Sequence, residues 1–198
     1  MAHHKKPLLP KNLASGRYAR VSKLDAVRQQ LDSAAYLKLH VNDSISILSL
    51  AYAAIGILDP LLKAKGLRKQ SLLRSDIIKP EYQAQAEEFF REAANFFKHG
   101  AKDASASLDF APEDSDLFLF LGIWGYGQIM GELTAKMSAA SIWLRVWSPQ
   151  FFPHAPPDAR VDHLRSHYQS DNGPIFYNHF MSTGNAVLGK TFPVRAKK

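Results

Sequence analysis

The sequence contains no cysteine among its 198 residues, and this absence excludes several kinds of site at once. Without thiols the chain can form no disulfide bond, no thiolate metal site and no cysteine nucleophile. It also lacks a Gly-rich phosphate loop, a nucleophile elbow, a His-Glu-x-x-His motif and any internal repeat. Because a cysteine-free chain suits a reducing compartment, we expect the protein in the cytoplasm.

Long hydrophobic runs are also scarce. Residues 45–58 and 117–130 are apolar, but each run has only 14 residues, whereas a helix needs about 20 to cross a bilayer. No apolar segment typical of a secretory signal precedes Leu24. We therefore expect no membrane span, and we expect both runs to form helices buried inside the protein.

Acidic residues are missing from both ends of the chain. Residues 1–20 carry five lysines and arginines without an acid, and residues 190–198 carry four more. Since the formal net charge is +7, the remainder is close to neutral. The pattern predicts a basic flexible arm over 1–20, one helical domain over 21–189 and a basic tail over 190–198. Such ends could bind RNA or another polyanion, or simply keep the protein soluble.

The spacing of apolar residues favours helices throughout, and no period-two pattern typical of a strand occurs. The sequence therefore predicts an all-α fold, a single-domain bundle of six to seven helices with the apolar second helix buried at its centre. Trp124, Trp143 and Trp147 are expected in the core. The expected helices span about 22–40, 45–62 with an end at Gly66, 80–99 with a cap at Gly100, 113–130, 134–147, 158–168 and a last short helix within 175–189.

Glycines are concentrated in the fourth expected helix. Each costs about 1 kcal/mol in a helix interior, so the group predicts a close approach to another helix, within the fold or across a dimer. With the phenylalanines of the turn at 151–152, this helix is one candidate surface for self-association. The glycines are Gly122, Gly125, Gly127 and Gly131.

Polar residues of the third helix recur at steps of four, three and four, at Glu88, Glu92, Asn95 and His99. They form one stripe, from which the neighbouring phenylalanines 89, 90, 96 and 97 are expected to pack away. A carboxylate, an amide and an imidazole on one rigid face suit general acid and base chemistry. The alternative is a solvent-exposed helix face, on which the helix dipole favours a protonated His99.

The segment Asn95-Phe96-Phe97-Lys98-His99 resembles the signature of the HEPN superfamily, and the first half of the chain resembles uncharacterised bacterial helical proteins with the same NFFKH motif. The HEPN motif is an Arg, often followed by Asn, with a His four to six residues beyond the Arg. The resemblance implies an all-α dimer that cleaves RNA without metal, with His99 assisting attack by the ribose hydroxyl. The motif Arg is replaced by Ala94, so we expect a HEPN-like core that is not catalytic at this motif.

A second candidate site is the segment RVDHLRSH, residues 160–167. Arg160 and His167 have six residues between them, at the outer limit of the HEPN spacing, and lie on one helix face, where they could form a catalytic pair. His163 and His167 are also an i,i+4 pair that could hold a divalent transition metal, as in DinB-like metal-binding bundles, which this arrangement resembles. A third ligand would have to come from His40, His154, His179 or Asp162. The other interpretation is a solvated basic helix face.

Three functions remain open at this point. The first is an RNA-binding or RNA-processing protein with a HEPN-like core. The second is a non-enzymatic interaction protein that forms a homodimer, and the third is a metal-binding helical bundle.

Overall fold

The computed structural model describes residues 19–69, 71–73, 83–98, 105–151 and 159–183. Within these ranges the chain forms helices and no strand, which confirms the all-α prediction. Most of both basic ends and Gly100 lie outside the described residues. The elements are α1 (Lys23–His40), α2 (Ser44–Ala64), α3 (Gln83–Lys98), α4 (Asp114–Met130), α5 (Ala135–Trp147), the 3-10 helix η2 (Pro149–Phe151), α6 (Ala159–His167) and α7 (Gly173–Thr183).

Local sequence signals explain where the helices begin and end. Ser22 and Asp25 form a capping box at the start of α1, and the Asp43 carboxylate accepts the Ser46 backbone N–H at the start of α2. The Thr134 hydroxyl caps α5 and also donates to the Asp32 carboxylate, which ties α5 to α1. α2 ends where expected, because Gly66 takes a positive φ of 68°.

The second helix, Ser44–Ala64, matches the expected span of 45–62 to within two residues at each end and includes Pro60. This 21-residue helix is long and apolar enough to cross a membrane, which is weak evidence because core helices of other proteins pass the same test. Only 39% of its most apolar window is buried. The prediction of a buried apolar helix is therefore confirmed for one side of α2 only.

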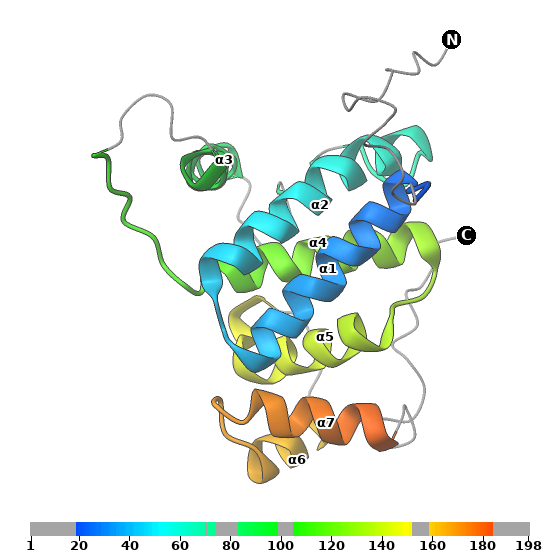
Figure 1. Cartoon of the computed structure of the whole chain (residues 1–198), viewed down its shortest axis with the longest axis vertical. Coiled ribbons are helices and arrows are strands. Elements are labelled where there is room, and N and C mark those ends of the chain that lie inside the picture. The colour runs from blue at the N-terminus through cyan, green and yellow to red at the C-terminus, as the bar shows by residue number, and fades with distance from the viewer. Residues whose placement is uncertain (1–18, 70, 74–82, 99–104, 152–158, 184–198) are drawn as a thin grey trace, which may run out of the picture.

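The centre of the fold is instead α4, which is buried on most of its circumference. In Figure 1, α1 and α2 cross over α4, and α5 lies below it, next to the lower end of α1. A Cβ atom on Gly122 would lie 2.7 Å from the Leu31 side chain, and one on Gly125 would lie 2.6 Å from that of Leu72. Because these glycines have no side chain, Leu31 and Leu72 pack directly against the α4 backbone. At Gly122 and Gly125 the predicted close approach is therefore made within the fold. Phe152 of the other proposed surface lies outside the described residues.

The helices α6 and α7 lie below α5 in Figure 1, on the side away from α2. The Trp143 ring packs against Phe176 of α7 with a centroid separation of 5.2 Å. The Arg165 guanidinium of α6 donates two hydrogen bonds to the Val146 carbonyl oxygen at the end of α5. Trp143 is buried, and Trp124 and Trp147 pack partly buried against the core, so the expected role of the tryptophans is confirmed.

Two glycines provide a matched test of this packing. A Cβ on Gly173 would collide with the backbone carbonyl oxygen of Leu39, whereas one on Gly56 meets open space. We expect Gly173→Ala to lower the free energy of unfolding by about 1–3 kcal/mol, because backbone cannot move aside as a side chain can. We expect Gly56→Ala to raise it by about 0.5–1 kcal/mol through helix propensity. Urea denaturation measures both, and equal effects would contradict the close contact of α7 with α1.

Candidate functional site

The HEPN-like segment lies on α3, where its residues point in opposite directions. Asn95 is exposed together with Glu88 and Glu92, so the described part of the predicted polar stripe is solvent-facing. Ala94 is only 5% exposed and belongs to the hydrophobic core. A guanidinium at this position would be buried among apolar side chains, which gives a structural reason for the missing Arg. His99 lies outside the described residues.

The phenylalanines of α3 behave only partly as expected. Phe90 is buried edge-on against Phe118, with ring centroids 4.9 Å apart, and Phe97 packs against Phe110. Phe96 is exposed, so the prediction that it packs away from solvent is wrong. Phe96 follows the exposed Glu92 by four residues and therefore lies on the solvent-facing side of the helix. The side chain of Phe89 is outside the described part.

The histidines of α6 are exposed and close to each other. The rings of His163 and His167 have centroids 4.0 Å apart, and His167 Nδ1 lies 2.8 Å from the His163 carbonyl oxygen. Because that oxygen can only accept, Nδ1 of His167 carries a proton, and Nε2 is the ring nitrogen left to act as base or ligand. Arg160 lies on the same helix, but its side chain is outside the described part.

The described candidates for a third metal ligand do not join this pair. His40 Nδ1 lies 3.0 Å from the Tyr36 carbonyl oxygen on α1, and His179 Nδ1 lies 2.6 Å from the Tyr168 hydroxyl. His154 falls outside the described residues. Among the residues that are described, no three His, Asp or Glu side chains are grouped closely enough to hold a metal ion.

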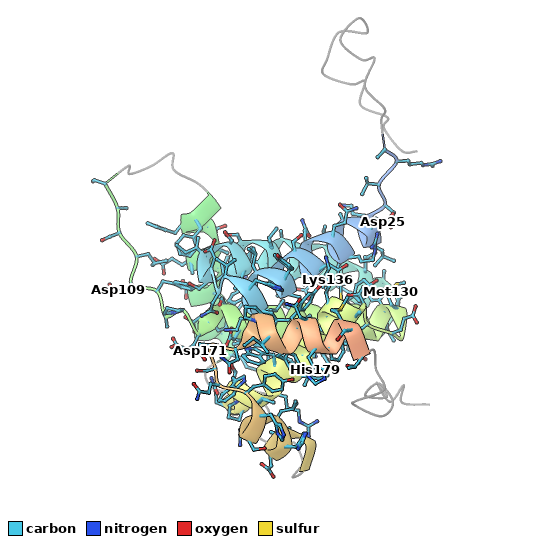
Figure 2. All side chains as sticks on the ribbon, turned by 60° about the horizontal axis from the view of Figure 1, so that its bottom comes forward. Asp25, Asp109, Met130, Lys136, Asp171 and His179 are labelled. Atoms are coloured by element: carbon cyan, nitrogen blue, oxygen red, sulfur yellow. The ribbon has the colours of Figure 1, made fainter. Side chains whose placement is uncertain are left out.

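A pocket of about 520 Å³ opens elsewhere, where α1 and α5 end and α4 and α7 begin. Figure 2 shows Asp171 of its rim on the turn that leads into α7. The residues that line the pocket are Lys38, Leu39, His40, Val41, Asn42, Glu113, Asp116, Trp143, Trp147, Ser148, Gln150, Ser170, Asp171, Gly173 and Pro174.

A buried ion pair forms part of the pocket wall. Lys38 Nζ lies 2.6 Å from Asp116 Oδ1, and the two side chains are only 13% and 6% exposed. The Ser148 hydroxyl donates to Asp116 Oδ2 at 2.7 Å, and Lys38 Nζ also donates to Asn42 Oδ1 at 2.9 Å. We call Lys38, Asp116 and Ser148 the buried polar cluster. It joins α1, α4 and α5.

The sequence contained a signal for this cluster that was not recognised. Lys38 follows Leu31 by seven residues and therefore continues the apolar stripe of α1, where a cation needs a partner. Asp116 lies in the first turn of α4, where a carboxylate also interacts favourably with the helix dipole. Its burial and its bond to Ser148 show a second role.

Negative charge gathers at the start of α4. Burial raises the pKa of the Asp114 carboxyl, and the neighbouring charge of Glu113 raises it further. Glu113 itself is exposed and makes no capping hydrogen bond through its side chain. The pocket rim therefore carries the Glu113 carboxylate, and its negative charge raises the pKa of the neighbouring Asp114.

Comparison with known protein families, curated proteins and solved structures finds no match for this chain. The likeness to the HEPN superfamily thus stays a prediction based on the α3 segment.

Removing one charge of the buried polar cluster should destabilise the protein strongly. We expect Lys38→Met to lower the free energy of unfolding by about 3 kcal/mol, because Asp116 would remain buried as an unpaired anion. The double variant Lys38→Met with Asp116→Asn should be more stable than Lys38→Met alone, since the amide is neutral and can still accept from Ser148. Chemical denaturation of the two single variants and the double variant measures this coupling, and additive losses would contradict it.

RNA cleavage at α6 is tested separately. If His167 Nε2 acts as the base, His167→Ala should abolish cleavage of a labelled RNA, and wild-type activity should persist in EDTA because no metal takes part. Asn178→Ala on exposed α7 is the control and should cleave normally. Purified wild-type protein that turns over no RNA would exclude this chemistry.

Proposed function

We propose that the chain is a non-enzymatic interaction protein that forms a homodimer through the exposed side of α2. The proposal rests on one observation, which is that a continuous face of this apolar helix is exposed to solvent. Its residues recur at steps of four, four, three, four and four, so they lie on one face, and all are exposed. We call them the α2 stripe: Ile45, Ser49, Ala53, Gly56, Pro60 and Ala64.

The α2 stripe is suited to packing against a second helix because it has no charged residue and only small residues at its middle. A Cβ on Gly56 would meet nothing within 4 Å, so the backbone of this turn is open to close approach. Small residues at a helix crossing let two backbones pack tightly, as large ones do not. By contrast, the polar stripe of α3 is charged, and leucine side chains already pack against Gly122 and Gly125 of α4.

The α2 stripe is also complementary to itself. In an antiparallel pair with a two-fold axis between Ala53 and Gly56, each of these residues faces the other in the second copy. Ser49 then faces Pro60, and Ile45 faces Ala64. The bulkiest residue of the stripe thus meets one of the smallest. Such an isologous contact closes on itself and yields a dimer rather than a filament.

Charges at the ends of α2 match the same arrangement. Lys63 would face Ser46 of the second copy and lie one helical turn from Asp43. Hydrogen bonds from the Ser46 side chain and backbone lower the pKa of the Asp43 carboxyl, so it is ionised at neutral pH. An exposed pair of this kind adds little affinity, but it favours the antiparallel register.

RNA binding is the second candidate function, and it is favoured by the charge of the ends. Nine lysines and arginines lie within 1–20 and 190–198, where no acid occurs. A dimer would bring together two copies of each end, which raises the avidity for a polyanion. This role requires no catalytic residue on α3.

A charge placed in the α2 stripe should prevent dimer formation. We expect Ala53→Arg to raise the dimer dissociation constant at least about 100-fold, because the two-fold axis would bring two guanidinium groups into one apolar contact. Analytical ultracentrifugation over a concentration series measures the constant. Circular dichroism should show that the variant stays folded, since Ala53 is exposed.

The matched control is Asn178→Arg, which adds the same charge to an exposed position of α7 and should dimerise like the wild type. A wild-type protein that remains monomeric at high concentration would refute the proposal. Equal weakening by both variants would refute the placement of the interface on α2. Sedimentation of the wild type with phospholipid vesicles through α2 would instead favour a membrane role.

A further inference from the structure

The pocket at the ends of α1 and α5 has the size of a ligand site. Its volume of about 520 Å³ lies within the range of about 300–1,000 Å³ that is typical of small-molecule sites. None of the residues that line it belongs to α2. A ligand there would be independent of the homodimer proposed above.

The charge of the pocket is set by its carboxylates. Lys38 contributes the one lysine ammonium of the lining, and this group is already engaged by Asp116 and Asn42. The second oxygen of Asp116 accepts from Ser148. Glu113 and Asp171 remain at the exposed rim without a cation among the lining residues to balance them. The described lining is therefore negative overall.

The helix dipoles do not reverse this sign. Helices α1 and α5 end at the pocket while α4 and α7 begin there, so the opposed helix dipoles largely cancel. His40 donates from Nδ1 to the Tyr36 carbonyl oxygen, so this nitrogen is already used within α1. The charge of Glu113 also raises the pKa of the adjacent Asp114. A positively charged ligand would relieve this excess of negative charge.

The pocket lining also contains two tryptophans. The rings of Trp143 and Trp147 are tilted against each other with centroids 5.7 Å apart, and both residues line the pocket. Indole is the side chain that attracts cations most strongly through its ring face. The Trp147 indole N–H is buried and has no hydrogen-bond partner in the described part of the chain, so the lining also holds an unused donor.

We propose that this pocket binds a small organic cation, an amine or a quaternary ammonium compound. The carboxylates of Glu113 and Asp171 compensate the charge, and the indoles of Trp143 and Trp147 cover the alkyl groups. The polar side chains of Gln150 and Ser170 at the rim supply acceptors for any N–H or O–H group of the ligand. An anion is disfavoured because Lys38 is not free to receive it.

Isothermal titration calorimetry with choline tests the proposal against two matched probes. We expect choline to bind the full-length protein, 3,3-dimethyl-1-butanol to bind at least about 10-fold more weakly, and inorganic phosphate not to compete. The alcohol has the shape of choline without its charge, so it separates electrostatic attraction from shape. Spermidine in place of choline shows whether a polyamine or a quaternary ammonium is the better occupant.

Variants of the exposed rim connect the binding to this pocket. Glu113→Gln and Asp171→Asn should each weaken choline binding about 5- to 20-fold without loss of folding, because both side chains are exposed. Glu132→Gln, which removes an exposed carboxylate outside the lining, should leave it unchanged. Three outcomes would overturn the proposal: no choline or spermidine binding at millimolar concentration, equal binding of the neutral alcohol, or equal weakening by Glu132→Gln. The Ala53→Arg variant should bind choline as the wild type does.

Discussion

The buried pairing of Lys38 with Asp116 is the constraint on which the rest of the structure depends. Removing two charges from water is costly, and the cost is recovered only where both ions keep hydrogen-bond partners. Asn42 and Ser148 provide these partners, and they lie at the ends of α1 and α5. The pairing therefore fixes where three helices meet. The pocket lies at this junction because charged ends cannot pack as closely as apolar helix faces.

The sequence predicted the class of the fold and most of its helices. Capping residues such as Ser22, Asp43 and Thr134 act within one turn, so their effect is readable without tertiary structure. The relative places of α2 and α4 were not readable in this way. Both helices are apolar on nearly every side, and hydropathy alone does not show which of them has neighbours all round. The side chains of Leu31 and Leu72, which fill the glycine positions of α4, decide that question.

The candidate sites were predicted less well than the fold. Asn95 and His167 were chosen by spacing along single helices, and they are exposed as that spacing implies. The pocket, in contrast, is assembled from Lys38, Glu113, Trp147 and Asp171, which are far apart in the chain. No short sequence motif could contain all four of these residues. The one local hint was Lys38 itself, a cation on an apolar stripe.

The proline of α2 has a consequence for hydration. Pro60 offers no N–H to the carbonyl oxygen of Gly56, one turn earlier on the same face. In a monomer, water can bind this oxygen at low cost. In a dimer built on the α2 stripe, two such oxygens would lie beside the symmetry axis, and each would require a donor. The centre of that interface would thus retain ordered water molecules, so its tightest point would not be its driest.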